Sequence, residues 1–337
     1  MDNLKKIVIG IILGDHSGIG PEITAKMLAK NKNNFIPVLI GSRKIYESLI
    51  RKLNFNTKLL NVKEFSEERD RLENRSVYFL DIKSGSDIKL GSISADSGHL
   101  VYNSILKGIE LQKTGYLDGL IMGPITKQAL HMAGLKFSSE FELFASVYGV
   151  PKVKSVIKCE DIFRATVVGH CSFIKIVDNL SVEEIVITSN ELLNVMHKFV
   201  LPEECKIAVA ALNPHAGEDG LFGDEEAKII TPAINRLKHN GENVIGPCPA
   251  DTVFLKARCG EVRGIVYLYH DQGNIAMKSS FFGDGVLIYT NIPGLIVSMS
   301  HGSALDIAGK GIADEKNMAA CVDTLITMIG NRRKSDD

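Results

Sequence analysis

The feature of this 337-residue sequence that most limits its fold is an alternation of short apolar runs with longer stretches of helical periodicity. The runs at 6–13 and 264–269 have the length and β-branched content of buried strands. The stretch 182–199 places its apolar residues on one face of a helix. This alternation predicts an α/β protein with a largely parallel sheet. Strands are expected at 6–13, 36–40, 77–80, 119–122, 166–168, 207–212, 264–269 and 286–289, and helices at 21–30, 43–53, 98–113, 182–199, 224–239 and 316–329.

The chain length suits two domains or one large α/β unit. No linker stands out by composition, but Gly123-Pro124 interrupts an apolar run and predicts a boundary near residue 125. We expect the chain to return to the first domain near residue 265. The prediction is a discontinuous first domain of residues 1–125 and 265–337, with residues 126–264 as the second domain.

Charge and composition exclude several classes of function. Lys and Arg total 39 against 40 for Asp and Glu, so no basic excess predicts binding to nucleic acid or to an anionic membrane. No apolar run approaches the roughly 20 residues that cross a bilayer. The six cysteines show no C-x-x-C spacing, which favours free thiols in a reducing compartment. We therefore expect a cytoplasmic protein whose partner is a small molecule.

Three apolar runs each stop at or just before a histidine, namely His170, His215 and His270. Ligands of open α/β sheets bind at the carboxyl ends of the strands. Three imidazoles at that edge would form a metal site with open positions for substrate or water. Each ring needs an acceptor that orients it, and Asp271 and Glu218 are near enough in sequence to serve.

A polar residue at the start of a loop is the simpler explanation for any one of these histidines. The arrangement of all three favours the site. Zinc, cobalt, manganese, magnesium or iron would suit such a donor set, and the sequence does not choose among them.

Two glycine-rich segments lie near strand ends. The turn at 14–22 either presents backbone N–H groups to an anion or is a tight turn that needs glycine. The loop that follows the run at 207–212 is either an ordinary surface loop or a cofactor contact, with Asn213, Gly217 and Glu218 as candidates.

Four further residues are candidates for chemistry. Asp251 either orients substrate and moves a proton or caps a helix. Lys278 is a candidate for holding an anionic group of the substrate, although most lysines are simply solvated. Lys127 and Asp271 complete the catalytic candidates.

Together these segments make the chain resemble the 4-hydroxythreonine-4-phosphate dehydrogenase family of pyridoxal phosphate biosynthesis. The resemblance runs from about residue 14 to about residue 324. Its motifs are residues 14–22, 122–127, 212–218, 249–254, 269–273 and 301–305.

The resemblance implies a two-domain fold similar to isopropylmalate dehydrogenase, with mixed, mostly parallel sheets flanked by helices. It also implies a homodimer whose active site lies in the cleft between the domains and is completed by both subunits. A divalent metal held by His170, His215 and His270 would polarise a secondary alcohol, which NAD or NADP oxidises before CO₂ is lost.

The substrate pocket departs from the family pattern. Where the resemblance places a substrate-binding His and Thr, this chain has Glu140 and Phe141, and an expected Asn and Arg fall on Leu287 and Ile296. Lys278 alone is clearly retained. Because these changes remove phosphate donors and Glu140 adds repulsion, the phosphate site is expected to be lost, and Ile296→Arg is expected to improve phosphate binding.

Four functions remain open from the sequence. The first is a dehydrogenase of this family acting on a hydroxy acid or dihydrodiol carboxylate without phosphate. The second is the name-giving activity with phosphate held by other groups. The third is a catalytically silent metal-binding paralogue, and the fourth is a metallohydrolase or lyase that uses no NAD.

Overall fold

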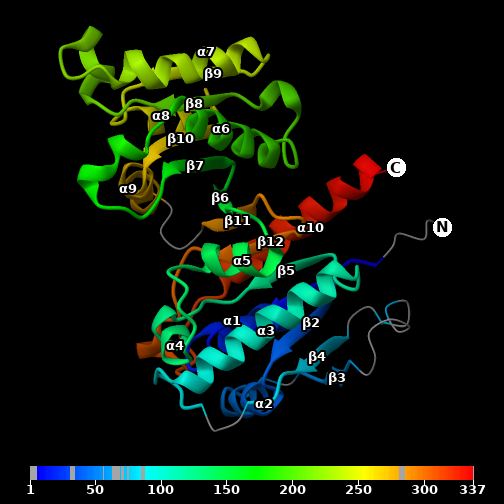
Figure 1. The fold of residues 1–337 in the computed structure, drawn as a ribbon. Coiled ribbons are helices and arrows are strands. Elements are labelled where there is room, and N and C mark those ends of the chain that lie inside the picture. The colour runs from blue at the N-terminus through cyan, green and yellow to red at the C-terminus, as the bar shows by residue number, and fades with distance from the viewer. Residues whose placement is uncertain are drawn as a thin grey trace. The chain divides into compact units, whose positions relative to one another are not determined.

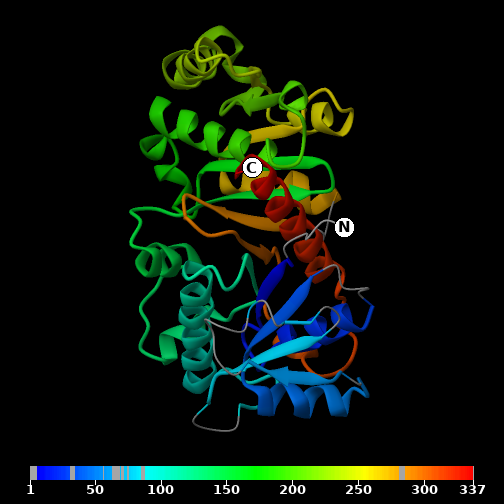
Figure 2. The same ribbon diagram turned by 90° about the vertical axis from the view of Figure 1, so that its right-hand side faces the viewer.

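The computed structural model describes residues 6–30, 35–55, 57–62, 69, 72–73, 76–84, 88–280 and 285–336. The chain divides into two compact units (Figures 1 and 2). Unit 1 comprises Met1–Val153 and Ile292–Asp337, and unit 2 comprises Lys154–Asn291. No helix in the described ranges is long and apolar enough to cross a membrane.

Unit 1 is built on a parallel sheet. Among the described residues its strands run in the order β3-β4-β2-β1-β5-β12, and every neighbouring pair is parallel. The strands are β1 (Val8–Ile12), β2 (Ile36–Gly41), β3 (Leu59–Asn61), β4 (Val77–Asp81), β5 (Gly119–Met122) and β12 (Ile296–Met299). The helices are α1 (Gly20–Lys30), α2 (Arg43–Lys52), α3 (Ala95–Lys113), α4 (Lys127–Met132), α5 (Glu140–Tyr148) and α10 (Lys316–Asp336).

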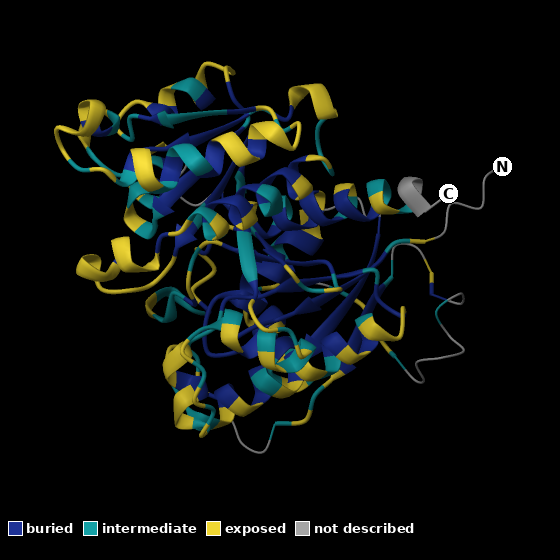
Figure 3. Ribbon diagram, turned by 45° about the horizontal axis from the view of Figure 1, so that its top comes forward, coloured by how far each residue is buried: buried dark blue, intermediate teal, exposed yellow. Residues whose placement is uncertain are grey.

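Helices cover both faces of this sheet. A Cβ atom at Gly119 would meet the side chain of Leu325 on α10, whereas the next residue, Leu120, reaches toward Gly108 on α3. Because successive side chains of a strand point to opposite faces, α10 and α3 lie on opposite sides of β5 (Figure 2). Every residue of β1 is therefore buried, as is usual for a strand covered on both faces. Figure 3 shows buried residues in the interior and exposed residues mainly on helices and loops at the surface.

Unit 2 contains a mixed sheet. Its strands run in the order β11-β6-β7-β10-β8-β9, with β6 antiparallel to both neighbours and β7, β10, β8 and β9 mutually parallel. The strands are β6 (Lys154–Cys159), β7 (Ile162–Val168), β8 (Ile207–Ala210), β9 (Val244–Cys248), β10 (Gly264–Tyr269) and β11 (Val286–Thr290). The helices are α6 (Val182–Met196), α7 (Thr231–His239), α8 (Val253–Arg258) and α9 (His270–Ser280).

The two faces of this sheet are also covered by different helices. A Cβ atom at Gly264 of β10 would meet Leu192 and Met196 of α6, while the ring of Tyr267 lies against Gly273 of α9. The predicted α/β class, with mostly parallel strands flanked by helices, is thus confirmed.

The division between the units differs from the boundaries expected at residues 125 and 265. Helices α4 and α5 belong to unit 1, where α4 packs on α3. Strand β10 belongs to unit 2 because it pairs with β7 on one side and β8 on the other. The long-range strand pairing therefore places these elements, and the local Gly-Pro signal does not mark a boundary.

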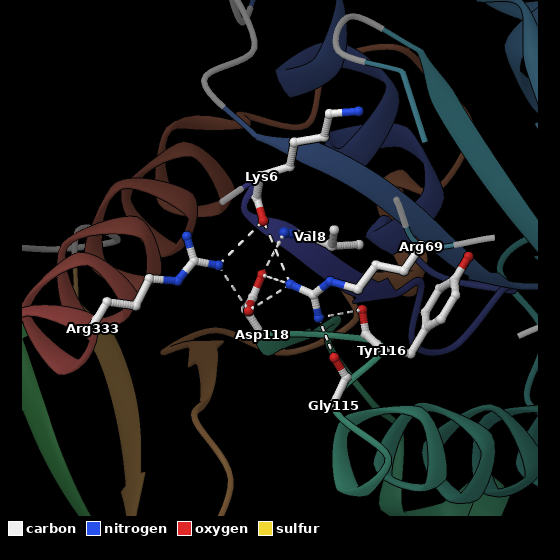
Figure 4. A network of polar contacts seen from close by, with 7 residues as sticks. All are labelled: Lys6, Val8, Arg69, Gly115, Tyr116, Asp118 and Arg333. Atoms are coloured by element: carbon white, nitrogen blue, oxygen red, sulfur yellow. Dashed lines mark hydrogen bonds and ion pairs between the residues drawn. The ribbon is translucent and has the colours of Figure 1, made fainter. Parts of the chain in front are cut away.

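A cluster of ion pairs around Asp118 fastens the two ends of unit 1 together (Figure 4). The Asp118 carboxylate accepts hydrogen bonds from the Arg69 guanidinium at 2.8 and 2.9 Å and from the Val8 N–H at 2.7 Å. Arg333 of α10 lies 3.0 Å from the same carboxylate and donates to the Lys6 carbonyl. The start of β1 is thereby joined to the last helix.

Candidate active site

The carboxyl ends of three adjacent strands of unit 2 carry the three predicted histidines. His170 lies two residues beyond β7, His270 directly follows β10, and His215 follows β8 after a short loop. Strand β10 is the centre of the three, paired in parallel with β7 and with β8. Since parallel strands end at the same edge of a sheet, all three histidines follow that edge.

His170 and His270 are in direct contact. Their ring centroids are 4.7 Å apart with an interplanar angle of 42°. His270 is the first residue of α9, so its position is set by the junction of β10 with that helix. Two of the three histidines that the sequence analysis assigned to one metal site therefore lie side by side, and their role as metal ligands stays a prediction.

Two carboxylates orient two of the imidazoles. Nδ1 of His270 lies 2.7 Å from Asp271 Oδ1, and Nδ1 of His215 lies 2.6 Å from Glu218 Oε1. A carboxylate only accepts, so each Nδ1 carries a hydrogen, and the neutral form of such a ring has its lone pair on Nε2. Asp271 and Glu218 thus make the contacts expected of them, and both rings have the tautomer that suits a metal ligand.

The loop that carries His215 has an unusual backbone. The residues at 215–219 all have positive φ angles, from 40° to 81°, and four of these five residues are not glycine. Each such residue costs about 1–2 kcal/mol relative to the right-handed conformation. The loop therefore needs contacts that hold it in place.

Glu226 supplies those contacts. Its buried carboxylate accepts the N–H groups of Leu212 and Asn213 at 2.8 Å each, and the Asn213 side-chain amide at 2.9 Å. Burial alone would raise the pKa of Glu226, but these hydrogen bonds outweigh it and lower the pKa. A Cβ at Gly217 would approach the Glu226 carboxylate to 2.9 Å, so the loop and the carboxylate fit closely.

The described residues contain no group of three or more His, Cys, Asp or Glu side chains spaced to hold a metal ion. Within unit 2 the structure brings His170 and His270 together, while His215 lies in the loop that follows β8, the neighbour of β10 on the other side from β7. Its side chain is 66% exposed, so Nε2 is accessible to a cation or to another chain.

The other predicted residues of unit 2 have simple surroundings. Lys278 is exposed on α9, two turns after His270. Asp251 is exposed, and the residue at the helix cap of α8 is Thr252, whose side chain makes no capping hydrogen bond. The Asn213 amide is engaged by Glu225 and Glu226.

Four of the positions singled out from the sequence lie in unit 1: Lys127, Glu140, Phe141 and Ile296. Lys127 is the exposed first residue of α4, and Glu140 and Phe141 occupy the first turn of α5. Leu287 lies on β11 of unit 2, and Ile296 lies on β12 of unit 1 with 1% exposure. An arginine at 296 would place a charge in the core, so Ile296→Arg is a test of folding rather than of phosphate binding.

The glycine-rich turn at 14–22 uses its N–H groups internally. Asp15 N–H donates to Pro124, Gly18 N–H to Asp15, and Ile19 N–H to Ser303. His16 is fully buried, with Nδ1 3.0 Å from the Gly14 carbonyl and Nε2 accepting from Ser42 N–H at 2.9 Å. The structure favours the tight turn over an anion site.

The sequence analysis missed two polar residues next to the candidate site. Arg164 is buried within β7, and its guanidinium donates to the side chains of Thr166 and Asn274. The signal in the sequence is a charged residue inside an apolar run, but the strand expected at 166–168 begins after Arg164 and leaves it out.

Comparisons with known proteins agree with this fold. The sequence family described as "Pyridoxal phosphate biosynthetic protein PdxA" matches residues 33–325. The chain is 35% identical over 319 residues to the D-threonate 4-phosphate dehydrogenase of Salmonella typhimurium, covering 93% of this chain and 96% of that protein. It is 35% identical over 319 residues to the 4-hydroxythreonine-4-phosphate dehydrogenase of Beijerinckia indica, covering 94% and 93%. The crystal structure of 4-hydroxythreonine-4-phosphate dehydrogenase from Klebsiella pneumoniae superposes with a TM-score of 0.85 at 29% identity, covering 97% and 99%.

Proposed function

This chain belongs to the PdxA family of pyridoxal phosphate biosynthetic proteins, and we propose that it oxidises the secondary alcohol of a small anionic hydroxy acid. The electron acceptor is NAD or NADP, a divalent metal assists, and the resulting β-keto acid loses CO₂. The observation that carries the proposal is the placement of three histidines after neighbouring parallel strands, with two of their rings in contact.

The three histidines of unit 2 are donors of the chemical type that binds a divalent cation. His170, His215 and His270 would hold it through neutral imidazole nitrogens, and zinc, cobalt, manganese and magnesium are the candidates. The hydrogen bonds from Nδ1 to Glu218 and Asp271 support this assignment, because they leave Nε2 of His215 and His270 as the donor. A bound cation and nicotinamide would supply a Lewis acid and a hydride acceptor.

The chain's own residues would position the substrate. Lys278 makes no hydrogen bond or ion pair with the described residues, so its ammonium is available to an anionic group. Asp251 and Lys127 remain the candidates for proton transfer, since both are exposed. In this proposal the cofactor contacts the loop of Asn213, Gly217 and Glu218, whose strained backbone is fixed by Glu226.

Two classes of substrate are in competition. A hydroxy acid or dihydrodiol carboxylate without phosphate is favoured by the buried Ile296 and by Glu140, which sit where phosphate and substrate donors are expected. A phosphorylated acid such as D-threonate 4-phosphate is favoured by the Salmonella relative's name and by the unpaired Lys278. Parallel assays with D-threonate and D-threonate 4-phosphate distinguish the two.

A homodimer completes the proposal. Exposed apolar side chains follow each candidate ligand: Phe173 and Ile174 come after His170, Leu221 and Phe222 after His215, and Ile275 after His270. Ile174 is 82% exposed and Leu221 70% exposed, which is unfavourable for an isolated chain. A second copy covering them would also let both subunits contribute to the site. None of the six cysteines, all of which the structure describes, forms a disulfide, which suits the reducing cytoplasm in which we place this dimer.

The test is His215→Ala, with His239→Ala as the matched control because His239 is exposed on α7. We expect His215→Ala to lose both the bound metal, measured by elemental analysis after gel filtration, and the metal-dependent reduction of NAD. His239→Ala should keep both. Full metal content and turnover in His215→Ala would remove this histidine from the site and contradict the proposed metal centre.

A further inference from the structure

Arg164 is a charged residue in the interior of unit 2 without an opposing charge. It is 5% exposed, and among the described residues no carboxylate pairs with it. Its guanidinium donates to Thr166 Oγ1 at 3.1 Å and to Asn274 Oδ1, while its Nε has no hydrogen-bond partner. A buried cation with an unsatisfied N–H destabilises the fold, so stability does not explain this side chain.

The cation lies on the face of the sheet that α9 covers. Thr166 of β7 is paired in register with Tyr267 of β10, whose ring packs against Gly273 of α9. The Tyr267 hydroxyl is also buried without a partner. Two unsatisfied polar groups therefore lie beneath the first two turns of α9, which begin at His270.

Asn274 connects this cation with the candidate site. Residues four apart on a helix are neighbours on one face, so His270, Asn274 and Lys278 form a single row along α9. A guanidinium only donates, so it fixes which end of the Asn274 amide is the oxygen. The amide nitrogen has no partner among the described residues, and the same is true of Lys278.

We propose that Asn274 is a substrate-binding residue whose amide donates to an oxygen of the anionic substrate, between the His270 end and the Lys278 end of the row. Arg164 is its positioning residue: it holds the amide with the nitrogen as the available donor and adds positive potential beneath the anion. The proposal deepens the proposed function and rests on it. The ligand class is a hydroxy acid that carries a second anionic or oxygen-rich group.

Three variants test the assignment: Asn274→Leu, Arg164→Met and the double variant. Asn235→Leu is the matched control, because Asn235 is an exposed amide on α7. Binding of D-threonate and D-threonate 4-phosphate is measured by calorimetry on zinc-loaded protein without NAD. KM, kcat and thermal unfolding are measured alongside.

We expect each single variant to weaken binding of the preferred acid about 10-fold, with kcat changed less than about two-fold. The double variant should lose no more than Asn274→Leu, since Arg164 acts through Asn274. Arg164→Met should unfold at or above the wild-type temperature, because an apolar side chain replaces an unpaired buried charge.

Unchanged binding in Asn274→Leu, or losses that add in the double variant, would overturn the assignment. A lowered unfolding temperature with normal binding in Arg164→Met would make Arg164 purely structural and also overturn it. Wild-type protein that binds and oxidises neither acid contradicts the proposed function itself. The two failures can be told apart. If the wild type is active but the Asn274 and Arg164 variants do not behave as expected, only the assignment of Asn274 and Arg164 is wrong.

Discussion

Histidines follow parallel strands in both units, but their surroundings are opposite. After β1 of unit 1, His16 is fully buried and both of its ring nitrogens are hydrogen-bonded. After β10 of unit 2, the side chain of His270 is 42% exposed and only Nδ1 is bonded, to Asp271. The position of a single histidine after a strand is therefore a weak sign of function, and an accessible ring nitrogen without a hydrogen bond is a stronger one.

The two units also differ in whether a charged side chain away from solvent has a partner of opposite charge. Asp118 of unit 1 is surrounded by Arg69, Arg333 and a backbone N–H, so its charge is neutralised (Figure 4). Arg164 of unit 2 has neutral partners only. Unit 1 uses its charges to join segments of the chain, whereas unit 2 keeps a positive charge next to its candidate site.

The largest expected effect is a loss of turnover when the partly exposed His270 is replaced. His270→Ala should reduce turnover at least about 1,000-fold while the unfolding temperature stays within about 2 °C, because the side chain is partly exposed and packs little. Steady-state NAD reduction and thermal unfolding measure the two quantities. A stable, fully active His270→Ala protein would erase the difference between the units.

Acid should destabilise the protein through His16. Burial lowers the pKa of His16 from 6.5 to about 4, so the unfolded chain takes up the proton first as the pH falls. The stability is complete above pH 6.5 and is lost toward pH 4, by about 3 kcal/mol over the whole window. Denaturant unfolding of wild type and His16→Gln from pH 7 to 4.5 measures this slope.

The buried histidine contributes most of the slope between pH 6.5 and about 5, because carboxylates take up protons only at lower pH. His16→Gln should therefore show a flatter pH dependence below pH 6.5. Identical profiles for wild type and His16→Gln would show that another group controls acid stability.

The smallest effect concerns the closed charge cluster of unit 1. Asp118→Asn leaves Arg69 and Arg333 without their counter-charge and should lower the free energy of unfolding by about 2 kcal/mol. Asp323→Asn, at an exposed carboxylate of α10, is the control and should be nearly neutral. Chemical denaturation measures both. Equal stabilities would mean that the Asp118 cluster does not fasten the two ends of the unit.

Local sequence patterns were sufficient to predict most of the individual strands and helices. The apolar runs and helical periodicity located most strands and helices, and the strand ends located His170 and His270 together. Strand β6 was not predicted because it is not a continuous apolar run: Lys and Ser interrupt its apolar residues. Helix α9 was missed because it begins at His270 directly after β10, without a capping residue in between.

Features set by distant pairing could not be predicted in this way. The unit boundary depends on β10 lying between β7 and β8, which no local signal reveals. The expected helix at 224–239 begins instead with a π-helical turn over Glu226–Ile230, and Glu226 at its start holds the His215 loop. One of the two partners of Arg164, Asn274, comes from α9, more than a hundred residues later in the sequence.

The backbone at 215–219 reverses the usual handedness of the chain next to a candidate ligand. Substitutions of the neighbouring loop residues would therefore change how firmly His215 is held, while the imidazole itself stays the same. Replacing Ala216, at φ 59°, with glycine would relieve about 1 kcal/mol of torsional energy but give the unfolded chain more freedom. Designers could use such exchanges to tune how stiffly this imidazole is presented, and thus how selectively the protein chooses among cations of different preferred geometry.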